Sequence, residues 1–128
     1  MSKIKKETRV KVWEKFNKHC AYCGCVLEYN KMQIDHITPK FRGTTQSELD
    51  YYGRIKGKDS LDNYNPSCAP CNSSKSTFDL DDWRFEIQQK KSRIIRDSST
   101  FRLLKRFGLV SISTDSVKFY FEKEDHNG

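Results

Sequence analysis

Five cysteines are the first residues whose types and spacing could do chemistry. Cys20 and Cys23 are separated by two residues, and this spacing lets one turn present both sulfurs to a single metal ion. The same spacing recurs later, and four thiolates form the tetrahedral shell of a structural Zn²⁺. The sequence therefore predicts a structural zinc site made of Cys20, Cys23, Cys68 and Cys71. Cys25 is then a spare small residue or a competitor of Cys23, and the alternatives to zinc are buried free thiols or disulfides.

A zinc ion at these cysteines would close a long segment of the chain. The segment between Cys23 and Cys68 contains 44 residues, well beyond the spacing of a simple DNA-binding zinc finger. Hydrophobic residues make up only 35% of the chain, and in a small metal-bound domain the free energy of metal binding becomes free energy of folding. The predicted zinc therefore compensates for a thin core and encloses further polar residues.

Asp35 and His36 are adjacent inside this segment, in the stretch MQIDHITPK. A histidine with a pKa of about 6.5 can accept a proton from water, and a hard cation such as Mg²⁺ prefers carboxylate and amide oxygens. Neighbouring strand residues point to opposite faces, so these two side chains can converge only at a strand end or an irregularity, which Pro39 favours. The alternative is a strand-end pair with ordinary hydrogen bonds.

Two asparagines and a lysine accompany this pair. Asn63 precedes the second cysteine pair by five residues and Asn72 follows it directly. Each also has a structural interpretation: Asn63 could form a turn in DNYNP, where Asn65 is its rival, and Asn72 could cap a helix. Lys75 could be a solvated helix lysine.

The stretches CAYCG, IDHITPKFRG and SLDNYNPSCAPCNSSKS together resemble the HNH endonucleases, or ββα-metal nucleases, in the subset with a double C-x-x-C zinc site. The resemblance covers residues 9–78 and departs from the family pattern in a long polar loop after Pro39. It implies that His36 is the general base and that Asp35 and Asn72 are ligands of a catalytic Mg²⁺ or Mn²⁺. It also implies that Asn63 holds the loop and strand that carry the base, and that Lys75 fills a basic position. The last family histidine is replaced here by asparagine, a variation that the family tolerates.

The resemblance implies a metal-dependent DNA endonuclease of the small phage type. A water activated by His36 would attack a phosphate held by the divalent cation, leaving a 5′-phosphate and a 3′-hydroxyl. Double-stranded DNA is the expected partner, nicked by a monomer or cut on both strands by a homodimer. The rival interpretations are a non-catalytic zinc-stabilised DNA-binding module and a protein-interaction zinc domain of the treble-clef kind.

Charge and hydropathy agree with a nucleic-acid partner. The net charge is +7, and residues 1–58 carry all of it, since residues 59–128 hold 11 basic and 11 acidic side chains. Between Arg84 and Arg106 there are 8 basic residues against 2 acidic ones, which could lie along a duplex. No run is apolar enough to span a membrane and the first residues lack a hydrophobic segment, so we expect a cytoplasmic, non-secreted protein.

The elements that must position these residues predict an α+β fold. The resemblance implies that its core is a ββα-metal unit with a treble-clef-like zinc site. The residue patterns place an N-terminal helix before this core, and two helices and a β-hairpin after it. We expect the nuclease core to span 1–78 and the extension, packed on it, to span 79–128. The predicted elements are a helix at 6–18, strands at 31–38 and 61–66, an exposed loop at 42–60, a short helix within 68–78, helices at 79–96 and 98–108, and hairpin strands at 109–113 and 117–122.

Overall fold

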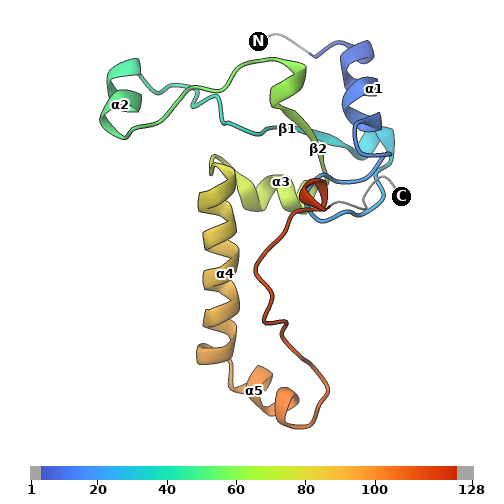
Figure 1. The fold of residues 1–128 in the computed structure, drawn as a ribbon, viewed down its shortest axis with the longest axis vertical. Coiled ribbons are helices and arrows are strands. Elements are labelled where there is room, and N and C mark those ends of the chain that lie inside the picture. The colour runs from blue at the N-terminus through green and yellow to red at the C-terminus, as the bar shows by residue number, and fades with distance from the viewer. Residues whose placement is uncertain (1–3, 124–128) are drawn as a thin grey trace. The chain divides into compact units, whose positions relative to one another are not determined.

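The computed structural model describes residues 4–123 and confirms the α+β fold with a ββα core (Figure 1). The described helices are α1 (Lys6–Glu14), α2 (Gln46–Tyr51), α3 (Ala69–Lys75), α4 (Leu80–Asp97) and α5 (Ser99–Arg106). The described strands are β1 (Gln33–His36) and β2 (Tyr64–Ser67), and 3₁₀ turns lie at Tyr29–Lys31, Leu61–Asn63 and Tyr120–Glu122.

Contacts divide the chain into two compact units. The described part of the first unit is residues 4–80 with 118–123, and the second unit is residues 81–117. The first unit contains α1, both strands, α3 and all five cysteines. The predicted division into 1–78 and 79–128 stays a prediction. Within residues 4–123, no helix has the length and apolar character needed to cross a bilayer.

β1 and β2 pair antiparallel, and α3 follows β2 directly. In the register of this ladder, Asp35 lies opposite Asn65 and His36 lies opposite Tyr64. The second cysteine pair spans the start of α3, because Cys68 is its N-cap and a proline occupies its first turn, where a missing N–H costs nothing. The end of one strand, the second cysteine pair and a short helix thus form one continuous unit.

α1 is shorter than the predicted helix at 6–18, because Asn17 and Lys18 both adopt positive φ. Val12 is its buried residue, and polar side chains attach the helix to the core. The Trp13 indole donates to the carbonyl of Leu27 at 2.9 Å, and Lys15 Nζ donates to the carbonyl of Tyr64 at 2.7 Å. The second of these bonds connects α1 to the beginning of β2.

The segment 42–60, which was predicted to be a loop, contains the helix α2. The Thr45 hydroxyl accepts from the backbone of Glu48, and the Glu48 carboxylate accepts from the backbone of Thr45. This reciprocal capping box starts a helix from a local T-x-x-E signal. The prediction of exposure holds for most of α2, since only Leu49 is buried in it.

The predicted hairpin at 109–113 and 117–122 is wrong, because these residues form no strand ladder in the described structure. Their backbone groups have other partners. The amides of Tyr120 and Phe121 donate to the carbonyls of Tyr22 and Ala21, at 3.0 and 2.9 Å, in the first unit. Phe119 is 2% exposed and its ring lies 5.5 Å from that of Tyr22. The last described residues therefore cover the turn that carries the first cysteine pair.

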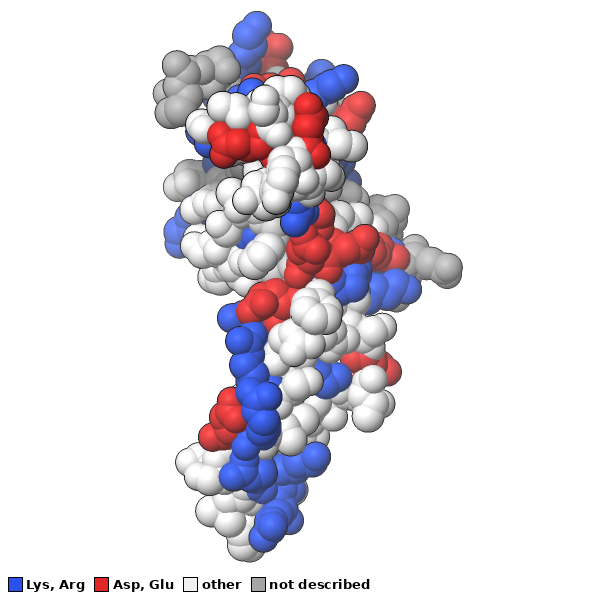
Figure 2. All heavy atoms as spheres, turned by 90° about the vertical axis from the view of Figure 1, so that its left-hand side faces the viewer, with Lys and Arg blue, Asp and Glu red and all other residues white. Residues whose placement is uncertain are grey.

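The second unit is built from most of α4, from α5 and from an extended return. Ser98 caps α5 by accepting from the amide of Phe101 at 3.1 Å. Arg84 donates to the carbonyl of Val117 at 3.0 Å, and Lys91 donates to the carbonyl of Asp115 at 3.2 Å. These side chains thus hold the extended return to α4 through its backbone carbonyls. Figure 2 shows Lys and Arg side chains gathered along one face of this unit.

Substitution of Gly57 tests the close packing of the loop that follows α2. A Cβ at position 57 would lie 1.8 Å from the carbonyl oxygen of Thr38. We expect Gly57→Ala to lower the free energy of unfolding by about 2 kcal/mol or more, because backbone must shift to relieve the overlap. Chemical denaturation measures this change.

Gly43→Asn is the matched control. Gly43 has a φ of +77° and nothing within 4 Å of a built Cβ, and asparagine tolerates that backbone conformation. Equal losses of stability in the two variants would contradict the packing argument.

Candidate active site and metal centre

The five cysteines gather at one place as free thiols. The sulfurs that all lie within 4.8 Å of one another belong to Cys20, Cys23, Cys25 and Cys68. Cys71 is not among these four, but its thiol interacts with those of Cys20 and Cys68. The structure thus places three of the four predicted ligands and the predicted competitor Cys25 among the mutually close sulfurs, with Cys71 beside them. The assignment of Cys71 as the fourth ligand stays a prediction.

Cys20 is the electrostatic centre of this cluster and is fully buried. A hydrogen bond from Cys71 is the main cause that lowers the pKa of Cys20 to about 4. The amides of Tyr22 and Cys68 also donate to the Cys20 sulfur, each at 3.4 Å. Burial and the neighbouring Cys23 raise the pKa of Cys25 to about 12. Cysteine sulfurs gathered at this spacing are a donor set that fits Zn²⁺, whose charge would favour thiolates in the shell.

The Asp35 carboxylate lies on the α3 side of β1, beside a buried lysine. Lys75 has no exposed surface, and its Nζ lies 3.2 Å from Asp35 Oδ2 and donates to the His36 carbonyl at 3.0 Å. The Tyr22 hydroxyl also donates to Asp35 Oδ2. Burial raises the pKa of Asp35 even though Lys75 and Tyr22 act in the opposite direction. Lys75 is therefore a buried partner of Asp35 and not a solvated helix lysine.

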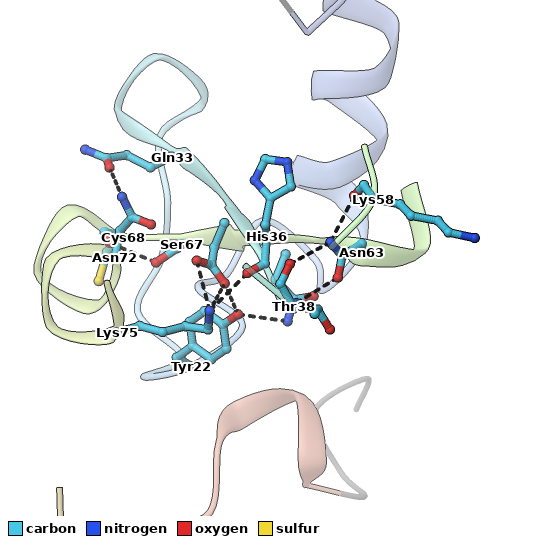
Figure 3. Close-up of polar contacts among 12 residues, drawn as sticks. Tyr22, Gln33, His36, Thr38, Lys58, Asn63, Ser67, Cys68, Asn72 and Lys75 are labelled. Atoms are coloured by element: carbon cyan, nitrogen blue, oxygen red, sulfur yellow. Dashed lines mark hydrogen bonds and ion pairs between the residues drawn. The ribbon is translucent and has the colours of Figure 1, made fainter. Parts of the chain in front are cut away.

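The His36 imidazole lies on the opposite side of β1 from Lys75 and Tyr22 (Figure 3). Its Nε2 is 2.8 Å from Oδ1 of Asp59, and Oδ2 of Asp59 accepts from Lys40 Nζ at 2.6 Å. Hydrogen bonds from Lys40 and then from His36 lower the pKa of Asp59 to about 2. Asp59 is thus a carboxylate at neutral pH, and it fixes one imidazole nitrogen while leaving Nδ1 for another partner.

Asn63 holds the strand end that carries His36. Its Oδ1 accepts from the Thr38 amide at 2.8 Å, and its Nδ2 donates to the carbonyls of Thr38 and Lys58 at 3.0 and 2.9 Å. Its rival, Asn65, is buried and donates to the Tyr22 hydroxyl at 3.3 Å. Asn63 is therefore the asparagine that connects β1 to the loop before β2.

A hollow of about 590 Å³ contains Asp35, His36 and Asn72 in its wall. The three side chains reach it from the end of β1 and from α3. The Asn72 Nδ2 donates to Gln33 Oε1, as Figure 3 shows, so the amide oxygen is the atom that Asn72 can offer to a cation. One carboxylate and one amide oxygen are hard donors that fit Mg²⁺ or Mn²⁺. Asp35 and His36 leave β1 on opposite faces, yet both border this space.

Two residues of the site were not predicted from the sequence. Asp59, the partner of His36, lies in the segment that was predicted to be an exposed loop, 23 positions away. Tyr22, the partner of Asp35, lies between the cysteines of the first pair. The position of Tyr22 in that turn was a signal that it would be oriented by the zinc site. No local pattern indicated Asp59.

Comparisons with known proteins support one family. Residues 20–78 match the family model described as HNH endonuclease. YoqL of Bacillus subtilis (strain 168), whose name describes it as an HNH endonuclease derived from the SPbeta prophage, is 33% identical over 78 residues. That alignment covers 56% of this chain and 30% of the relative, so the chain spans less than a third of its length. The Type II-C Cas9 enzyme from Actinomyces naeslundii is similar over 82% of this chain and 11% of its own, with 22% identity and a TM-score of 0.49.

Serine variants of two cysteines distinguish the possible zinc ligand sets. We expect Cys71→Ser to lose zinc and to unfold at lower temperature, because its thiol contacts both Cys20 and Cys68 and closes the second C-x-x-C pair. Cys25→Ser is expected to retain one zinc ion per chain. Atomic emission spectroscopy and thermal unfolding measure these outcomes. Loss of zinc from Cys25→Ser with retention in Cys71→Ser would instead assign Cys25 as the fourth ligand.

Proposed function

We propose that this chain, whose residues 20–78 match the HNH endonuclease family model, is a metal-dependent DNA endonuclease that hydrolyses phosphodiester bonds. The observation that carries the proposal is the shared hollow that Asp35, His36 and Asn72 border at the end of β1. It places a base beside two oxygen ligands that could hold one divalent cation against a phosphate. The cleavage would leave a 5′-phosphate and a 3′-hydroxyl.

His36 acts as the general base through Nδ1 in this proposal. In this tautomer Nε2 carries the proton and donates a hydrogen bond to Asp59. The lone pair that can accept a proton is then on Nδ1, and the hydrogen bond orients the ring. A carboxylate partner also stabilises the imidazolium that forms when a water gives up its proton. Lys40 holds the second oxygen of Asp59, so this carboxylate is fixed at both oxygens. Asn63 keeps the strand end in place while the imidazole takes up the proton.

Asp35 and Asn72 would hold the catalytic cation. A bound Mg²⁺ or Mn²⁺ supplies positive charge to the scissile phosphate and to the departing 3′-oxygen. Lys75 and Tyr22 fix the Asp35 carboxylate from the buried side, which orients it toward the hollow. Lys40 and Arg42 also line this hollow and add positive charge for a phosphate.

The similarity to YoqL also bears on the substrate and on where the reaction would take place. The prophage origin in the name of YoqL favours a phage-related nuclease that acts on double-stranded DNA in the bacterial cytoplasm. One chain offers one cleavage site, so a monomer would nick and a homodimer would cut both strands.

Replacing His36 tests the proposed base. We expect His36→Ala to lower the rate of nicking of supercoiled plasmid in Mg²⁺ or Mn²⁺ by about 100-fold or more, the usual contribution of a positioned general base. Zinc content should be unchanged, since His36 is not in the cysteine cluster.

His19→Ala is the matched control, because His19 lies outside the hollow and its Nδ1 contacts the Asn17 carbonyl. A wild-type protein with full zinc and no divalent-dependent nicking would refute the enzyme and leave the zinc-stabilised DNA-binding module.

Asp59→Asn tests the fixed orientation of the imidazole. The amide keeps the size of the side chain but removes the charge that pairs with His36 and Lys40. We expect nicking to slow by about 10-fold at saturating DNA, because the imidazolium loses its counterion. Asp62→Asn, an exposed neighbour with the same charge change, should nick at the wild-type rate. Equal rates for wild type and Asp59→Asn would show that the carboxylate has no part in the reaction.

A further inference from the structure

A second hollow, of about 520 Å³, lies in the first unit on the side of His36 that faces α1. It is distinct from the hollow that Asp35 and Asn72 border. Its cationic side chains are Lys5, Lys11, Lys40 and Arg42. The Thr8 hydroxyl and Ser60 add hydrogen-bonding groups. The space is basic and open to solvent, which suits an anionic ligand that lies along a surface.

The charge balance of this hollow is strongly positive. Asp59 is the carboxylate in its wall, and this side chain is already paired with Lys40 and His36. Among residues 4–123, Lys5 and Lys11 have no acidic partner, so their charges are available to a ligand. Both belong to or cap α1, which Lys15 anchors to the backbone of β2. The two ammonium groups are therefore carried by a fixed element.

The two hollows meet at the residues that they share. His36, Lys40 and Arg42 line both of them. A ligand with one phosphate at His36 and more than one negative charge would therefore extend from the first hollow into the second. Successive phosphates of a nucleic-acid strand have this property, since each strand carries one charge per about 3.4 Å of duplex axis.

We propose that the Lys5–Lys11 hollow binds the phosphates of the nucleic-acid strand that flank the phosphate at His36. This inference rests on the proposed function for the position of the scissile phosphate. It adds a binding site on α1 that the catalytic residues do not include. Contacts to phosphates are independent of base sequence, so this site would set the strand position and the affinity without reading bases.

Binding of a fluorescent 20-base-pair duplex, measured by anisotropy without added Mg²⁺ or Mn²⁺, tests the site. The test variant is Lys5→Gln/Lys11→Gln, which keeps side chains of helix-compatible shape. The control is Lys6→Gln/Lys31→Gln, which removes the same charge from exposed lysines outside both hollows. We expect the test variant to bind about 10-fold more weakly at 0.1 M salt and to lower the slope of log Kd against log salt by about 2. The control should change Kd by less than about 2-fold.

The outcomes separate this site from the enzyme. The expected difference between the two variants supports the site even if the wild type fails to nick plasmid, in which case the proposed function alone is refuted. Equal weakening by both variants would overturn the site, because binding would then follow net charge only. Poly-glutamate that binds as tightly as the duplex, with the same dependence on Lys5 and Lys11, would overturn the assignment to nucleic acid. Unchanged zinc content in both variants shows that the fold is retained.

Discussion

The candidate site depends on the ion pair between the buried ammonium of Lys75 and the Asp35 carboxylate. The ammonium lies between the Asp35 carboxylate and the His36 carbonyl, and none of the Lys75 side chain is exposed. Removing one member of such a pair leaves an uncompensated buried charge, at a cost of about 3–5 kcal/mol. The ion pair therefore fixes α3 against β1 and holds the proposed metal ligand Asp35 in one position. It also separates the roles of two adjacent residues, because His36 is left on the other face of the strand.

The cysteine cluster and Asn63 close two loops, one inside the other. The cluster brings the first cysteine pair to the start of α3 across 44 intervening residues, and loop closure of this length is where a metal stabilises most. Asn63 then joins the end of β1 to the loop before β2 through three hydrogen bonds. Between these restraints the chain can vary, and α2 with its exposed tyrosines occupies that part.

The sequence predicted the parts of this structure that carry local signals. The C-x-x-C spacing indicated the cysteine cluster. The distance of five residues to the second cysteine pair favoured Asn63 over Asn65. The capping box of α2 was also a local signal, although the polar composition of 42–60 obscured it. The hairpin prediction failed because alternation alone does not specify the partner of a strand. The amides of Tyr120 and Phe121 bond to the turn of the first cysteine pair instead of to a neighbouring strand. Asp59 could not be found, since only the folded chain brings it to His36.

We propose that Asp35, held by Lys75, presents an oxygen to a divalent cation in the hollow that His36 borders. Anomalous scattering from a zinc-loaded crystal soaked in Mn²⁺ tests this most directly, because the manganese and zinc edges are separate. We expect one manganese peak in the hollow, about 2 Å from an Asp35 oxygen and without His36 as a ligand. A hollow that stays free of manganese, while the same preparation nicks DNA in Mn²⁺, would contradict it.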